Sequence, residues 1–170
     1  MSVEFKNALI AEFRHRVFGE SVVRLKKCLA QLTDEEVWWR PNENSNAVGN
    51  LILHLCGNAR QWILSGLFGQ ADLRKRQAEF DQRDIIPKDA LLALLDNLCI
   101  EIDALLDSVT PEELLRPRPV QVYDSITGVS ILIHVIEHFS YHVGQMTYGV
   151  KAVKNRQLNF YTENLEIGNG

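Results

Sequence analysis

The fold depends most on one stretch of sequence, GVSILIHVIEHFSYHVGQMTYGVKAV, which spans residues 128–153. Apolar residues recur in it every three or four positions, which is the spacing of a helix that buries one face. Ser125 or Thr127 precedes the stretch as a candidate N-cap. We therefore expect a long amphipathic helix here, and its apolar face needs other helices to cover it.

Three further stretches show the same spacing, at residues 3–31, 46–66 and 88–108. Ser45 or Asn46 is a candidate N-cap for the second of them. No run alternates in the period of two that a strand requires, and the strand signals near residues 119–123 are short and carry prolines. In the first helix we expect one buried stripe, formed by Phe5, Leu9, Phe13, Val17, Leu25 and Leu29.

A long charged segment, residues 67–86, joins the second helix to the third. Connections of this length within a compact domain are typical of a crossover or of a functional flap. The sequence therefore predicts an all-α fold, a four-helix bundle with one long crossover between helices 2 and 3. With 170 residues, we expect one domain over residues 1–170.

Composition argues against several classes of partner. The net charge of −4 is unlike the basic excess of nucleic-acid-binding proteins. No segment approaches the length of uninterrupted apolar sequence that spans a membrane, and the first residues do not resemble a secretory signal. Three cysteines without a CxxC pair indicate a reducing compartment, so we expect a cytoplasmic protein without disulfides.

Histidines are concentrated on the predicted fourth helix. His138 and His142 are four residues apart, so their side chains lie on one face and can converge on one metal ion. His134 lies one turn earlier, and His54 sits among apolar residues in the second helix. If these two helices pack face to face, His54 can complete a three-histidine site that leaves a coordination position open.

Other interpretations of these histidines stay open. An HxxxH pair occurs in many helices by chance, and a lone core histidine is more often a hydrogen-bonded packing residue than a ligand. A zincin site is excluded because Phe139, and not a glutamate, follows His138. A ferritin-like di-iron site is excluded because it requires two Glu-x-x-His pairs, and the sequence does not contain two.

The stretch SNAVGNLILHLCGNARQW, from Ser45 to Trp62, and the later HVIEHFSYHVGQ, from His134 to Gln145, resemble the DinB-like superfamily. This superfamily includes the YfiT-like group of metal-dependent hydrolases, and the resemblance covers most of the chain. It implies a four-helix bundle, often a homodimer, and one divalent metal ion, usually nickel or zinc. The ligands implied are His54, His138 and His142, with His134 outside that set.

Some members of this superfamily are S-transferases that use a low-molecular-weight thiol, so the resemblance implies a thiol or a water activated at the metal, acting on a small-molecule substrate. His134, Asn58 and Gln145 are expected beside the ligands, where an amide can orient substrate or fix an imidazole tautomer. The alternative is a non-catalytic bundle in which the metal serves stability, sensing or a stress response.

Two other groups of residues carry weaker signals. Trp38 and Trp39 point in different directions on a helical turn, so one is expected in the core and the other at the edge of a cleft. The run Arg74–Arg76 is most simply a solvated charge run, although a crossover folded over the site would let it bind a carboxylate of a thiol cofactor.

Overall fold

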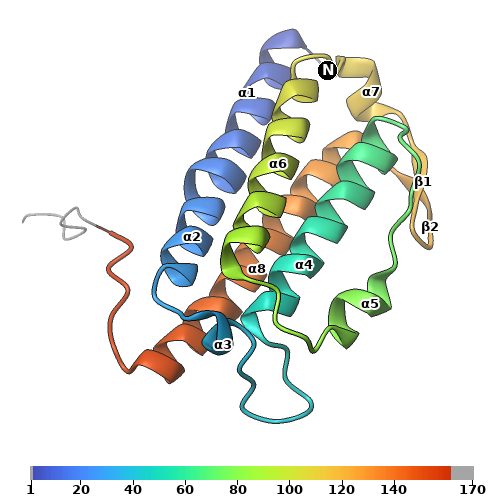
Figure 1. The fold of residues 1–170 in the computed structure, drawn as a ribbon. Helices are drawn as coiled ribbons and strands as arrows, with labels where there is room; N and C mark the ends of the chain where they lie inside the picture. The colour runs from blue at the N-terminus through green and yellow to red at the C-terminus, as the bar shows by residue number, and fades with distance from the viewer. Residues whose placement is uncertain (1, 162–170) are drawn as a thin grey trace, which may run out of the picture.

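The computed structural model describes residues 2–161 as a bundle of four long helical rods (Figure 1). The rods are α1, η1 and α2 in one continuous run (Val3–Arg14, His15–Val22 and Val23–Leu29), α4 with η2 (Val48–Ala59 and Arg60–Leu67), α6 (Lys88–Leu106) and α8 (Gly128–Lys154). The η segments are π-helical. Short elements connect the rods: α3 (Asp34–Val37), α5 (Arg76–Asp81), α7 (Pro111–Leu115), β1 (Arg118–Val120) and β2 (Tyr123–Ile126).

The predicted crossover is confirmed. In Figure 1 the chain leaves the end of η2, runs back along the outside of α4 through α5, and only then enters α6. As a result α4 and α6 run in the same direction, while α8 runs opposite to α4 and packs against it. The last part of the domain expected over residues 1–170, residues 162–170, lies outside the described residues.

The core is filled by the inward faces of the four rods. Phe13, Val17, Leu25 and Leu29 of the expected stripe are buried. Leu9 is only half-buried, and Phe5, in the first turn of α1, is 57% exposed, so the expected stripe is wrong at Phe5. Among the described helices, none combines the length and the apolar character that a membrane span needs.

The start of the second rod differs from the prediction. Its N-cap is Ala47, and neither Ser45 nor Asn46 takes that position. Asn50, at the third helical position, makes the reciprocal bond of a capping box, because its Oδ1 accepts from the Ala47 amide at 3.2 Å, while the Ser45 hydroxyl donates to Asn42. For α8, Thr127 is the N-cap, as one of the two expected candidates.

A small antiparallel hairpin, β1–β2, was not expected from the sequence. Arg118 pairs with Ile126, and Val120 pairs with Tyr123. Pro119 lies between the two paired positions, so its missing N–H removes no bond from this ladder. Val120 is buried against Gly66, where an added Cβ would lie 3.0 Å from a Val120 methyl carbon. Tertiary contact with the end of η2 therefore stabilises a strand too short to be recognised alone.

Candidate metal centre

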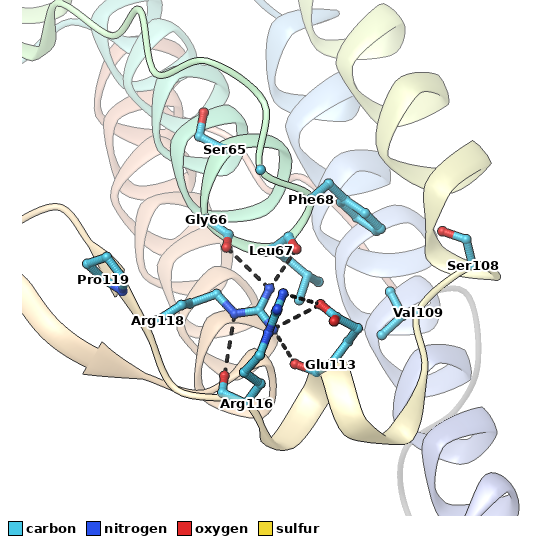
Figure 2. A pocket seen from close by; sticks show the side chains of 11 residues that line it. Ser65, Gly66, Leu67, Phe68, Ser108, Val109, Glu113, Arg116, Arg118 and Pro119 are labelled. Atoms are coloured by element: carbon cyan, nitrogen blue, oxygen red, sulfur yellow. Dashed lines mark hydrogen bonds and ion pairs between the residues drawn. The ribbon is translucent and has the colours of Figure 1, made fainter.

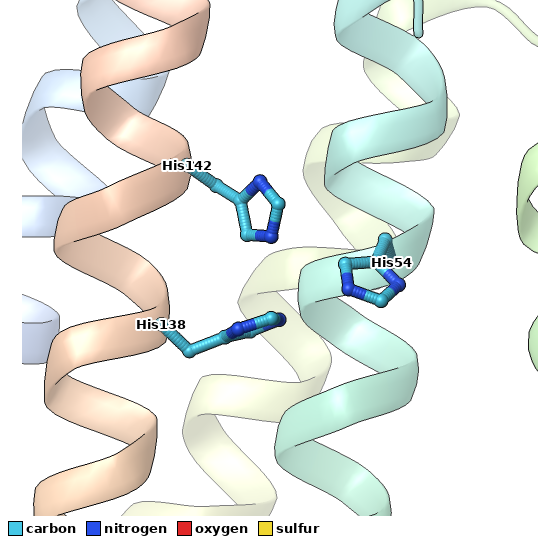
Figure 3. Close-up of side chains that lie close together, drawn as sticks. All are labelled: His54, His138 and His142. Carbon is cyan, nitrogen blue, oxygen red and sulfur yellow. The ribbon is translucent and has the colours of Figure 1, made fainter.

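Three histidines from two rods meet inside the bundle (Figure 3). His54 comes from α4, and His138 and His142 come from successive turns of α8. One candidate ligand nitrogen from each lies within 4.8 Å of the others. The ring centroids of His54 are 4.9 Å from His138 and 5.1 Å from His142. The packing of α4 on α8 thus brings these residues together as the sequence predicted, and we call them the histidine triad.

The triad fits a bound cation. His138 Nε2 is buried and has no hydrogen-bond partner among the residues that the structure describes. A buried polar nitrogen without a partner costs about 1–3 kcal/mol, so such an atom calls for an explanation. Three imidazoles that share one small volume can offer a divalent ion three lone pairs, and His138 Nε2 would supply one of them.

The Nδ1 atoms of the other two histidines already have hydrogen-bond partners. His142 Nδ1 lies 2.7 Å from Gln145 Oε1, which can only accept, so Nδ1 carries the proton and the lone pair is left on Nε2, as a metal ligand requires. His54 Nδ1 lies 2.9 Å from Glu79 Oε2, which is also an acceptor, and 3.1 Å from Arg74 Nη2, which is a donor.

The surroundings also keep the imidazoles of His138 and His142 uncharged. Burial, and after it the neighbouring imidazoles and Arg74, lower the pKa of His138 to about 3. Burial lowers the pKa of His142 as well, against the hydrogen bond to Gln145, which raises it. Neutral imidazole is the form that binds metal ions, so these shifts favour binding at neutral pH.

His134 lies next to the triad residue His138, and Asn58 contacts His134. The His134 ring stacks on Trp62 with centroids 3.7 Å apart, and it also stacks on His138 at 5.4 Å. Asn58 Nδ2 lies 3.2 Å from His134 Nε2. His134 therefore packs against the triad without joining it, and Gln145 is the one of the three expected neighbours that hydrogen-bonds a triad residue.

The crossover supplies Glu79, which the sequence analysis missed, and gives Arg74 a role that it did not assign. Glu79 of α5 bonds His54, and Arg74 bonds Glu79 through Nε at 2.7 Å and through Nη2 at 2.9 Å. Their side chains are only 11% and 4% exposed. The prediction of a solvated charge run is wrong for Arg74, because its guanidinium is buried against Glu79. Because the Arg74 guanidinium is paired with Glu79, it is not free to bind a carboxylate of a thiol cofactor.

Electrostatics keep Glu79 ionised. Burial alone would raise the pKa of Glu79, but the hydrogen bonds and charges of Arg74 and His54 outweigh it, and the pKa lies below its ordinary value. An ionised carboxylate accepts hydrogen bonds and cannot donate them. Glu79 therefore presents an acceptor to His54.

A sequence signal for this contact exists on α4 and η2. Asn50, His54, Gly57 and Gln61 follow each other at helical spacing, so they form one face that is polar or lacks a side chain. Asn50 Nδ2 donates to the Glu79 carbonyl oxygen at 2.8 Å, and Gln61 Oε1 accepts from Arg74 at 2.9 Å. Such a face on a core helix indicates that a polar segment docks on it.

A cavity of about 750 Å³ lies beside the triad, between the loop after α3, the start of α4 and the end of α8. Gln145 lines it, so a residue bonded to His142 also forms part of its wall. Trp39 is exposed at this cavity and Trp38 is buried, which confirms the expected division of the pair. No triad histidine lines the cavity.

A second cavity, of about 490 Å³, lies at the other end of the bundle near the hairpin (Figure 2). Arg118 crosses it, with Nη1 donating to the Leu67 carbonyl oxygen at 2.7 Å and Nη2 donating to the Glu113 carbonyl oxygen. These bonds satisfy free carbonyls at the end of η2 and tie the hairpin to the bundle. Arg118 thus has a structural role here.

Comparisons with known proteins agree with this architecture. A family model described as a protein of unknown function, DUF1572, matches residues 4–165. A conserved protein from Enterococcus faecalis superposes with a TM-score of 0.69 at 18% identity, over 92% of this chain and 99% of that one. A DinB-like protein, YjoA from Bacillus subtilis, gives 0.64 at 20% identity over the same shares. No curated protein matches the chain. The fold is therefore DinB-like.

Proposed function

Because the chain belongs to the DUF1572 family, whose function is unknown, we propose a function from its own site. We propose that it is a metal-dependent enzyme that acts on a small molecule. Its one divalent ion is held by His54, His138 and His142. The observation that carries this proposal is the buried His138 Nε2, which lacks a hydrogen-bond partner among the described residues. The two neighbouring rings, each with its Nδ1 already bonded, add to the support.

The donor set suits a small group of metals. Three imidazole nitrogens are ligands that zinc and nickel accept well, and we propose one of these two as the resident ion. When bound with a free coordination position, such an ion lowers the pKa of a thiol or a water and so supplies a nucleophile near neutral pH. The surrounding burial limits the access of bulk water, and Gln145 holds the His142 ring in place.

For the substrate site we propose the 750 Å³ cavity beside Gln145. Its wall contains the apolar residues Leu51, Val150 and Val153, with side-chain amides and the hydroxyls of Ser45 and Tyr148 among them. The one acidic side chain in the wall, Glu36, is paired with Lys154 at 2.6 Å. This lining suits an uncharged molecule with an apolar body. The reaction is S-transfer from a low-molecular-weight thiol or hydrolysis by water.

The test begins with the metal content of protein purified without a histidine tag. We expect about one divalent ion per chain in the wild type, and none in His138→Ala. The exposed His15 provides the matched control, because His15→Ala removes a histidine without touching the triad. The loaded protein is then screened with thiols plus electrophiles and with esters. Turnover that is absent in His138→Ala supports the proposal, and a wild type that binds no divalent ion overturns it.

One observation favours a second function, a non-catalytic metal-binding bundle. His54 and His142 are buried, and no triad histidine lines either of the two cavities described above. Cobalt substitution separates the two functions. An enzyme with a free coordination position develops thiolate-to-cobalt charge-transfer absorption when a small thiol is added. A closed structural site keeps its spectrum unchanged, while loss of its metal lowers the melting temperature.

A homodimer is also part of the proposal. Tyr141 and Tyr148 are exposed along α8, together with Ile133. Exposed aromatic side chains on one helix suit a protein interface. The molar mass in solution, measured by light scattering during gel filtration, distinguishes a dimer from a monomer.

A further inference from the structure

The crossover brings a buried carboxylate to the back of one triad histidine. Glu79 Oε2 lies 2.9 Å from His54 Nδ1, on the ring nitrogen that a metal bound at Nε2 leaves free. Phe80, the next residue, packs on the same imidazole with centroids 4.7 Å apart. Two consecutive side chains of α5 therefore contact His54, one by a hydrogen bond and one by its ring.

The backbone of this segment is anchored independently of the glutamate side chain. Asn50, fully buried in α4, donates through Nδ2 to the Glu79 carbonyl oxygen at 2.8 Å and to the Gln82 carbonyl oxygen at 3.1 Å. Arg40 donates to the same Gln82 oxygen at 2.9 Å. These bonds hold α5 at one height along α4, level with His54.

The surface of α4 has room for the carboxylate only because residue 57 is glycine. A Cβ added to Gly57 would lie 2.0 Å from Glu79 Oε1 and 3.0 Å from Arg74 Nε. Any other residue at this position would occupy space that the Glu79–Arg74 pair now fills. The α4 helix therefore contains a recess that accommodates this ion pair one turn after His54.

His54 Nδ1 has two competing partners. Arg74 Nη2 lies 3.1 Å from it, and a guanidinium can only donate. If Nδ1 accepted that bond, the ring proton would sit on Nε2, and this nitrogen could not bind a metal. Glu79 requires the opposite tautomer, and Arg74 Nη2 already donates to Glu79 Oε2 at 2.9 Å.

We infer that Glu79 is a positioning residue that fixes His54 in the tautomer with Nδ1 protonated, so that Nε2 is free for a metal, and that Arg74 holds Glu79 in place. This inference rests on the metal-binding part of the proposed function. Carboxylates behind a histidine ligand typically contribute 10–100-fold to metal affinity. Without Glu79, Arg74 is left as the donor to Nδ1 and favours the tautomer that cannot bind.

The test combines Glu79→Gln and Arg74→Met with Glu101→Gln as the matched control. Glu101 forms a Glu–Arg pair with Arg60 at 2.7 Å, away from the triad. Zinc affinity is measured by competition with a chelator, and the His54 tautomer of the metal-free protein is read from ¹H–¹⁵N correlations of its ring. Circular dichroism checks that each variant is folded.

We expect the affinity of Glu79→Gln to fall about 10–100-fold, with a loss of the Nδ1-protonated form of His54. Arg74→Met should lose less zinc affinity and should keep His54 protonated at Nδ1. Glu101→Gln should match the wild type in both measurements. Unchanged affinity and tautomer in folded Glu79→Gln would overturn the inference, as would an equal tautomer change in Arg74→Met. If the wild type binds neither zinc nor nickel, the proposed function fails, while the tautomer in the metal-free protein still tests the role of Glu79.

Discussion

At the scale of single residues, the unusual feature is a set of histidines kept neutral inside a bundle. Burial is the main cause of the lowered pKa values of His134, His138 and His142. A histidine with a lowered pKa takes up its proton more readily in the unfolded chain than in the folded one. The free energy of unfolding of the metal-free protein therefore depends on pH through these histidines.

This sensitivity predicts how stability changes with pH. Between the ordinary histidine value of 6.5 and the pKa of His138 at about 3, the unfolded state binds more protons, so the free energy of unfolding falls as the pH falls. Each such histidine contributes a slope of up to about 1.4 kcal/mol per pH unit. Urea unfolding of the metal-free protein at pH 7, 6 and 5 should give a shallower loss for His138→Asn than for the wild type.

The control is His15→Asn, because His15 is exposed and should leave the slope unchanged. Carboxylates contribute an acid-dependent loss to every variant, so the difference between variants is the quantity to compare. Parallel curves for the wild type and His138→Asn would contradict the prediction.

At the scale of elements, glycines on α4 determine what can dock on it. Gly57 makes room for the Glu79–Arg74 pair, and Gly49 makes room for the Trp38 ring, whose nearest atoms would lie 2.7 Å from an added Cβ. The crossover and the segment around α3 thus both reach α4 at positions without a side chain.

Replacing Gly57 by alanine should displace α5. We expect Gly57→Ala to lower the free energy of unfolding by about 1–3 kcal/mol, because the new methyl group overlaps a buried ion pair. Gly144→Ala is the matched control, since nothing lies within 4 Å of its added Cβ. Alanine within a helix should there raise stability by up to about 1 kcal/mol. Equal urea midpoints for the two variants would refute this reading of the recess.

Replacing Gly49 by alanine should disturb the packing of Trp38 on α4. Trp38 is buried over Gly49 and donates through Nε1 to the Ile86 carbonyl oxygen at 3.0 Å, which ties the segment after α3 to the end of the crossover. The added methyl group would push the indole away and weaken that bond. We expect Gly49→Ala to cost about 1–3 kcal/mol and to change the tryptophan fluorescence, with unchanged emission as the contrary outcome.

At the scale of the whole molecule, the triad links two rods that are distant in the sequence. Its donors come from α4 and α8, and they share one small volume only when the bundle is assembled. A ligand that binds the folded state alone stabilises it by mass action. Metal binding and global stability should therefore be coupled.

This coupling predicts a shift in thermal unfolding. Zinc at 100 times its dissociation constant should stabilise the wild type by about 2.7 kcal/mol, and a chelator should reverse the shift. His54→Ala should show no such rise, because one of the two rods no longer contributes a donor. Differential scanning calorimetry with and without zinc provides the measurement, and an equal rise in His54→Ala would place the metal elsewhere.

Local sequence patterns alone predict the four rods, the position of the crossover, and the shared face of His138 and His142. These features follow from local periodicity, because apolar spacing and the geometry of one helical turn depend only on nearby residues. The same argument placed His54 toward the interior, since its neighbours along α4 are apolar.

Which polar groups contact one another depends on how the segments pack in three dimensions. Glu79 lies 25 residues from His54 in the chain, and the bond between them depends on the path of the crossover and the height at which Asn50 anchors it. The burial of Arg74 and the β1–β2 hairpin likewise depend on surfaces supplied by other segments. The polar spacing on α4 and η2 indicates that a polar segment docks there, but it does not specify which residues of that segment make the contacts. Those contacts depend on the tertiary structure, because a short polar segment gains its structure from the surface on which it docks.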